Sequence, residues 1–95
     1  SCKGDIMKAF ITVIGKDRVG IIAAVSATLA NHKINIEDIS QTILQGIFTM
    51  IMAVDLSECD LSFEEIARIL AQKGSELGVE ISIRHEAIFQ AMHRI

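Results

Sequence analysis

Hydrophobic and polar positions alternate in four stretches of the chain, which is the spacing of β-strands. The four predicted strands are residues 8–14, 34–44, 48–56 and 79–84. In the first stretch both alternating sets are largely apolar, so we expect a central strand that is covered on two sides. In the second, Ile34 and Ile36 alternate, and the phase then shifts before Ile39. An odd step across Glu37-Asp38 predicts a β-bulge. The short Gln45-Gly46 link predicts that the second and third strands form an antiparallel hairpin.

Two other stretches carry apolar residues three and four positions apart, the spacing of helices. The first, residues 19–31, has Ile22, Val25 and Leu29 as its stripe, and alanines surround it. Few polar residues remain for a solvated face. We therefore expect this helix to be covered on more than one side, with a second subunit as a source of the extra cover.

The second helix carries its own start and stop signals. Ser62-Phe63-Glu64-Glu65 is a capping box, and Gly78 stands where a left-handed residue ends a helix. Gly74 is expected to weaken the last turn. The side chains predicted to be buried are Phe63, Ile66, Ile69, Leu70 and Leu77.

The order strand–helix–strand–strand–helix–strand predicts an α+β ferredoxin-like sandwich, with one four-stranded antiparallel sheet and both helices on one face. Residues 86–95 carry Ile88, Met92 and Ile95 at helical spacing, which predicts a short C-terminal helix. The open face of the sheet needs cover, from this tail helix, a partner subunit or both. Residues 1–6 fit no element, so we expect a cloning remnant or disordered terminus before a single domain at 7–95.

Composition narrows the classes of partner. The 95 residues are 51% hydrophobic and 4% aromatic, and the net charge is −3. This argues against a nucleic-acid or anionic membrane partner, which needs a basic face. Two cysteines make no disulfide framework, and neither a signal peptide nor a membrane span is visible. We therefore expect a cytoplasmic protein with free thiols.

Catalytic and metal chemistry find little support. His32, His85 and His93 lack the spacing of a zinc site. Cys59 lies between two acids, which would blunt its reactivity, and no nucleophile motif is present. We expect no enzyme activity, no cofactor and no metal.

One loop has a distinctive signature, Gly15-Lys16-Asp17-Arg18-Val19-Gly20. Its glycine spacing is half of a phosphate-binding loop, but Ile21 and Ile22 stand where that motif requires Lys and Ser or Thr. Two interpretations remain open. The loop is a tight strand-to-helix turn with Asp17 as N-cap, or this turn also binds a small anionic or zwitterionic ligand at the helix N-terminus.

This loop, followed by an apolar helix and Ile34-Asn35-Ile36-Glu37-Asp38-Ile39, resembles ACT domains, which are ferredoxin-like modules that bind amino acids and similar small molecules. The resemblance is closest to short stand-alone ACT proteins of bacteria and archaea, and covers residues 7–95. The loop also resembles the ACT segments of formyltetrahydrofolate deformylases and of the glycine cleavage repressor, but neither a catalytic domain nor a second ACT copy is present here. His32-Lys33 departs from relatives, which often have a glycine turn there.

The resemblance implies a ligand at a subunit interface, between the loop after the first strand and the start of the second strand. The residues implied are Asp17, Arg18, Val19, Gly20, Ile21, Asn35 and Ile36. Backbone N–H groups near Gly20 would take a carboxylate, and Asp17 would accept from an ammonium group. Family dimers typically join sheets edge to edge, with first helices adjacent.

The expected function is thus a non-catalytic, regulatory ACT module that binds a small molecule, an amino acid, as a homodimer. Two alternatives stay open. One is an interaction subunit that binds a regulated protein and no small ligand. The other is a regulator like the glycine cleavage repressor.

Overall fold

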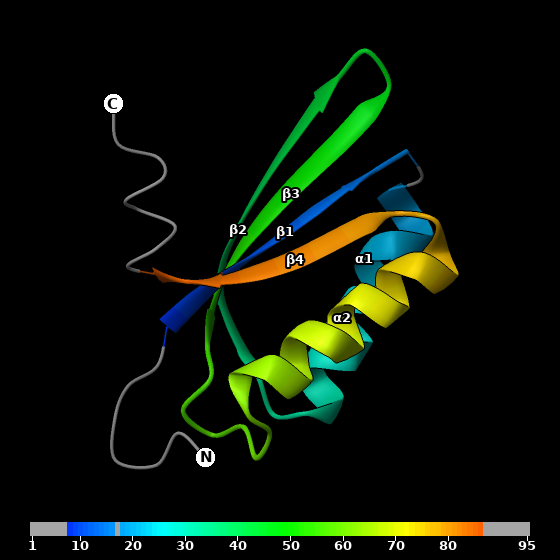
Figure 1. The fold of residues 1–95 in the computed structure, drawn as a ribbon. Coiled ribbons are helices and arrows are strands. Elements are labelled where there is room, and N and C mark those ends of the chain that lie inside the picture. Colours follow the sequence, from blue (N-terminus) through cyan, green and yellow to red (C-terminus); the bar gives the residue numbers. More distant parts are fainter. Residues whose placement is uncertain (1–7, 17, 87–95) are drawn as a thin grey trace.

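The computed structural model describes residues 8–16 and 18–86, which form a four-stranded sheet and two helices (Figure 1). The predictions for residues 1–6, for Asp17 as an N-cap and for the tail helix lie outside these residues. The elements in chain order are β1 (Lys8–Gly15), α1 (Arg18–Asn31), β2 (Asn35–Leu44), β3 (Ile47–Asp55), α2 (Phe63–Leu77) and β4 (Glu80–His85). The strands lie in the order β2-β3-β1-β4, and all neighbours are antiparallel. The ferredoxin-like prediction is confirmed.

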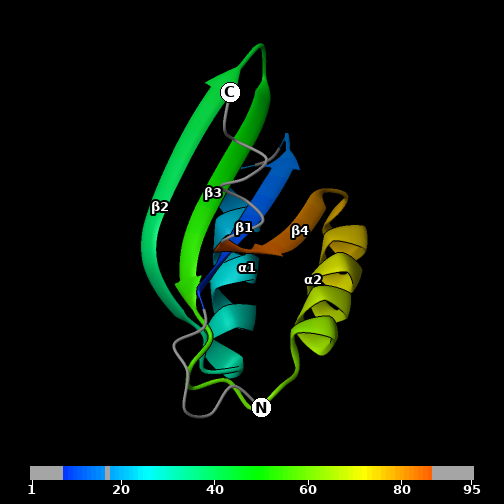
Figure 2. The ribbon, with the colours of Figure 1, turned by 60° about the vertical axis from the view of Figure 1, so that its left-hand side comes forward.

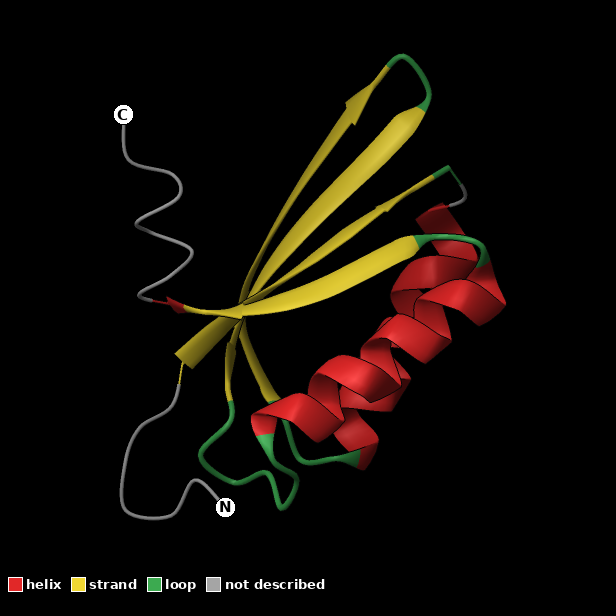
Figure 3. Cartoon of the chain, in the orientation of Figure 1, coloured by secondary structure: helices red, strands yellow, loops and turns green. Residues whose placement is uncertain are grey.

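Both helices cover one face of the sheet and leave the opposite face without a helix among the described residues (Figures 2 and 3). β1 is a central strand, as predicted, because it pairs with β3 on one side and β4 on the other. Ala9, Ile11 and Val13 point from β1 toward the helices and are fully buried. Across the sheet, Ile11 lies opposite Met52 and Ile83. The core is thus centred on the helix-facing side of β1 and β3.

The predicted hairpin and bulge are both present in β2 and β3. Ile36 lies opposite Val54 and Asp38 opposite Ala53, so Glu37 is the extra residue. At the hairpin turn, Gln45 and Gly46 have φ of 53° and 79°. Two positive φ values are typical of the turn that matches the twist of a two-residue hairpin.

Helix α1 turns a slightly different face to the core than the sequence pattern predicts. Ile21, Val25 and Leu29 are buried, whereas Ile22, predicted to be in the stripe, is half-buried. The residues spaced by four from Ile21 face the sheet, and Ile22 lies about 100° around the helix axis from Ile21. Thr28 is also buried, and its hydroxyl donates to the carbonyl of Ala24 at 3.0 Å.

Helix α2 has the predicted ends. The Ser62 hydroxyl accepts from the N–H of Glu65 at 3.1 Å, and the Glu65 carboxylate accepts from the N–H of Ser62 at 2.9 Å. The latter bond holds the pKa of Glu65 below its usual value, since it favours the charged form. Gly78 ends the helix with φ 77°. The capping box and the left-handed glycine are confirmed.

The buried side of α2 is narrower than predicted. Ile66 and Leu70 are buried, as expected, but Phe63, Ile69 and Leu77 are only half-buried. Gly74, about one turn after Leu70, is also buried. A Cβ on Gly74 would lie 2.8 Å from the carbonyl oxygen of Val79. Gly74 therefore allows β4 to approach the helix closely, a role that helix propensity alone does not indicate.

β4 is half-buried as predicted, with Ile81 and Ile83 facing the helices. At its end, the His85 ring stacks on Phe63 at the start of α2, with ring centroids 3.9 Å apart. This contact joins the outer strand to the first turn of α2. Within residues 8–16 and 18–86, neither helix is long and apolar enough to cross a bilayer.

Candidate ligand-binding site

The loop that the sequence singles out lies at one end of the sheet, where β1 passes into α1. Gly15, the last residue of β1, lies against β4, and a Cβ on it would overlap the side chain of Val79. This glycine is explained by strand packing. Lys16 is exposed, and Arg18 is the first residue of α1.

The first turn of α1 is open to solvent. Val19 is 77% exposed, and a Cβ on Gly20 would meet no atom within 4 Å. Ile21 is different, because its side chain is buried in the core. Ile21 thus offers only its backbone to a ligand, whereas Gly20 leaves space beside the free N–H groups of the helix start. Those groups favour an anion.

The other predicted residues, Asn35 and Ile36, lie at the opposite end of the sheet. Asn35 faces Asp55 in the register, and Asp55 faces Lys8 at the start of β1, whereas Gly15 faces Phe48. The seven residue steps from Lys8 to Gly15 span about 23 Å along a strand. Asn35 is exposed and Ile36 is half-buried. One chain therefore does not bring the two halves of the predicted site together.

An ionic cluster surrounds Asn35 at that end. The Lys8 ammonium lies 2.7 and 2.6 Å from the two carboxylate oxygens of Glu37, and 3.8 Å from the Asp55 carboxylate. The hydrogen bond to Glu37 raises the pKa of Lys8, and hydrogen bonds from Ser57 lower the pKa of Asp55. The bulge thus turns Glu37 toward a cation two strands away. The sequence pattern predicted the bulge but not this pairing, because the pairing depends on the strand register.

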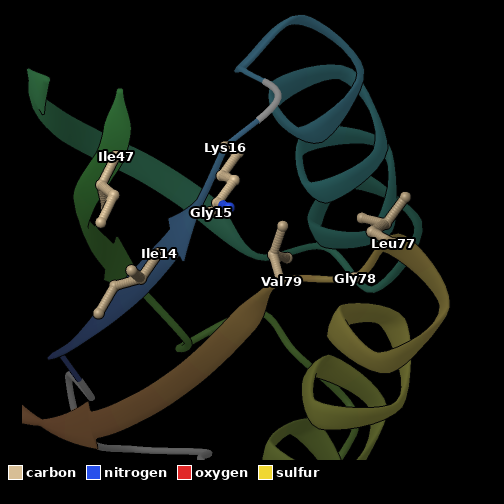
Figure 4. Close-up of a pocket in the computed structure, with 7 residues that line it drawn as sticks. All are labelled: Ile14, Gly15, Lys16, Ile47, Leu77, Gly78 and Val79. Atoms are coloured by element: carbon tan, nitrogen blue, oxygen red, sulfur yellow. The ribbon is translucent and has the colours of Figure 1, made fainter. Parts of the chain in front are cut away.

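A hollow of about 470 Å³ lies beside the loop end of the sheet (Figure 4). Ile14 and Ile47 stand on one side of it, Leu77, Gly78 and Val79 on the other, and Gly15 and Lys16 between them. Its lining side chains are apolar except for that of Lys16. Among the predicted site residues whose side chains the structure describes, which are Val19, Gly20, Ile21, Asn35 and Ile36, none lines it. Sequence reasoning missed it because the α2–β4 turn, which forms one wall, reaches the loop only through the tertiary fold.

Other chemistry is sparse in the part of the chain that the structure describes. There, no three His, Cys, Asp or Glu side chains gather as a metal site would require. The Cys59 thiol is free and buried. The described residues therefore offer a ligand backbone N–H groups, apolar contacts and single charges.

Comparison with known proteins places the chain in a family. Residues 8–84 match the ACT domain. The chain belongs to the ACT domain family. It is 60% identical to a UPF0237 protein of Clostridium acetobutylicum over 94% of this chain and 100% of that one. It also superposes on the ACT domain protein from Streptococcus pneumoniae with a TM-score of 0.79, at 44% identity, covering 94% and 100% of the two chains.

A more distant likeness shows the fold alone. A putative glycine cleavage system transcriptional repressor has a TM-score of 0.75 at 12% identity, over 84% of this chain and 46% of that one. The family resemblance stated from the loop and the second strand is thus confirmed. This chain has the ACT fold of its relatives, and its site residues remain predictions.

Proposed function

We propose that this ACT chain is a non-catalytic regulatory module that works as a homodimer and binds an amino acid at each of two sites. Each site combines the loop 15–21 of one copy with the start of β2 of the other. Backbone N–H groups near Gly20 bind the ligand carboxylate, Asp17 accepts from its ammonium group, and Asn35 completes the polar contacts. The input is an amino acid, and the output is an allosteric change at a regulated protein.

The observation that carries this proposal is the separation of the two half-sites. Gly20 lies at the hairpin end of the sheet, and Asn35 lies at the end where β2 starts. A two-fold axis beside β2 would make two β2 strands antiparallel. The hairpin end of one copy would then lie beside the β2 start of the other. Two equivalent composite sites would result.

The exposed groups along this edge support a second copy. β2 is an outer strand, so one row of its backbone N–H and C=O groups has no strand partner among residues 8–16 and 18–86. Ile39 and Ile43, which share the helix side of the sheet with Met52 and Phe48, are 42% and 54% exposed. Ala23 and Ala27 of α1 are exposed as well. Sheet pairing along β2 would cover these apolar groups.

The first experiment is a thermal-shift screen of the full chain against the twenty amino acids, with the mass measured by light scattering. A ligand at one hundred times its Kd adds about 2.7 kcal/mol, which raises the Tm by about 10 °C. Gly20→Asp should abolish the shift and keep the fold, because an acid in the first turn of a helix is favourable. Gly20→Asn, which adds similar bulk without charge, separates crowding from repulsion of the carboxylate.

A mixing experiment tests the composite site. Gly20→Asp and Asn35→Ala should each bind no ligand alone. Random reassortment of the two variants makes about half of the dimers mixed, and each mixed dimer holds one intact site. About a quarter of the binding capacity should then return. Ligand binding by wild type with no recovery in verified mixed dimers would place each site within one chain.

The hairpin tip favours a second candidate function. Leu44 is 71% exposed and Ile47 is 47% exposed. A subunit that docks on another protein through this tip would need no small ligand. A dimer without any thermal shift at millimolar amino acid would favour this candidate, and Leu44→Asp should then abolish capture of the regulated protein.

A further inference from the structure

The sheet face opposite the helices has an apolar stripe along its two central strands. The residues that share this face on β1 and β3 are Phe10, Thr12, Ile14, Thr49, Ile51 and Ala53. The outer strands present polar residues on the same face, with Ser82 and Arg84 on β4 and Asp38, Ser40 and Thr42 on β2. The stripe is therefore about two strands wide and has polar margins on both sides.

These dimensions fit one short helix. Two strands give a stripe about 10 Å wide, which is the diameter of a helix with its side chains. Phe10 and Ile14 lie about 13 Å apart along β1, and nine helical residues span about 13.5 Å. A second sheet packed on this face would cover all four strands. It would then also bury the charged residues Arg84 and Asp38 on the outer strands, which is unfavourable. The shape and the charge pattern thus favour a helix as the cover of this face.

The chain leaves the sheet beside the near end of the stripe. β4 ends at His85, opposite Ala9, and Glu86, the last described residue, already has helical backbone. The Glu86 charge contributes to the raised pKa of Lys8, after the larger effect of Glu37. Lys8 shares its side of β1 with Phe10, since side chains alternate along a strand. The chain thus leaves the outer strand beside the end of the stripe that carries Phe10, which lies opposite Arg84.

The nine residues that follow have the matching pattern. Ile88, Met92 and Ile95 are spaced by four and three positions, which places them on one side of a helix. Gln90 falls on the opposite side. We propose that residues 87–95 form a helix that packs its Ile88, Met92 and Ile95 side on the β1–β3 stripe of its own chain. The β2 edge then stays available to a second copy. This inference does not depend on any ligand.

The test uses tryptophan as a reporter, because the chain has none. In full-length Met92→Trp, the indole should emit at shorter wavelength than in the matched variant Gln90→Trp. It should also be quenched about threefold more slowly by acrylamide, because docking removes the ring from water. Thr12→Lys, on the stripe, should abolish this protection. Thr42→Lys, on the polar margin, should leave it intact.

A second measurement covers the case in which tryptophan disturbs the packing. Met92→Asp should lower the Tm by about 5 °C or more, whereas Gln90→Asp should leave it within about 1 °C. Equal exposure of the two tryptophans together with equal Tm values for the two aspartate variants would overturn the proposal. Protection that disappears on dilution would also overturn it, since the tail would then lie on another copy.

Discussion

The two helices are alike in length and position but opposite in their surfaces. α1 has 14 residues and α2 has 15, and both lie on the same face of the sheet (Figure 1). α2 carries charges along its outer side, a capping box at Ser62 and a left-handed end at Gly78. α1 has Arg18 as its single charged residue, and its outer side is largely alanine. The comparison teaches that α2 carries its own end signals and a charged outer side, whereas the outer side of α1 is small and apolar, as the proposed dimer interface requires.

Alanine on an outer helix face has a specific physical consequence. Ala23 and Ala27 are exposed in the single chain, and their small side chains let a second backbone approach closely. Alanine also loses no rotamer entropy when it is covered. The outer side of α1 is therefore the surface that the proposed dimer would place against a second α1.

The largest effect should come from a charge on this alanine face. In Ala27→Arg, a buried guanidinium without a partner should weaken self-association about 100-fold or more. Sedimentation or light scattering across a dilution series measures this change. The matched variant is Ala71→Arg, because Ala71 is exposed on the outer side of α2. That variant should leave the dimer unchanged, and two equal dimer affinities would show that α1 does not lie in the interface.

The same contrast explains which parts of the fold the sequence could predict. The ends of α2, the hairpin and the bulge at Glu37 were all predicted correctly, because local signals within a few residues specify them. The stripe of α1 was wrong at Ile22, because in a helix with almost no polar residues the pattern does not mark which side faces the sheet. In α2 the polar residues mark the solvated side, and the prediction was wrong only in how deeply Phe63, Ile69 and Leu77 are buried. In α1 tertiary packing decides which side faces the sheet.

The candidate site divides in the same way. The sequence predicted a strand-to-helix turn at residues 15–20, and in the structure α1 begins at Arg18 with open space beside Gly20. The pairing of Glu37 with Lys8 and the apolar wall at Val79 were missed, because strand register and the α2–β4 turn create them. The sequence pattern could not predict the distance between Gly20 and Asn35, because only the strand order places them at opposite ends of the sheet.

The second prediction compares a glycine-to-alanine substitution in each of the two helices. Glycine to alanine normally stabilises a helix by about 1 kcal/mol. Gly20→Ala in α1 should follow that rule in part, since its Cβ meets open space. Gly74→Ala in α2 should instead lower the free energy of unfolding by about 1–3 kcal/mol, because its Cβ would lie 2.8 Å from the Val79 carbonyl oxygen. Urea unfolding of both variants measures the difference, and a stabilised Gly74→Ala would show that β4 yields to the added methyl group.

The smallest expected effect concerns the C-terminal ends of the two helices, which have the same backbone geometry but different residues. The N–H of Val79 donates to the carbonyl of Gly74 at 2.9 Å, and the N–H of Ile34 donates to that of Leu29 at 2.9 Å. Each bond spans five residues, and the residue before each donor is left-handed: Gly78 has φ 77° in α2, and Lys33 has φ 59° in α1. Both helices therefore end in the Schellman arrangement.

Lysine at this position has a cost that glycine does not. The left-handed conformation costs an L-residue about 1 kcal/mol relative to glycine. Lys33→Gly should therefore raise the free energy of unfolding by up to about 1 kcal/mol, and Gly78→Lys should lower it by a similar amount. Urea unfolding of the two single variants and of the exchanged pair measures both effects. The exchanged pair should lie close to wild type, because the two sites are far apart in the fold and their effects should add. If Lys33→Gly destabilises the chain, the lysine side chain makes a contact at the end of α1 that outweighs the strain, and α1 then has a terminal anchor of its own.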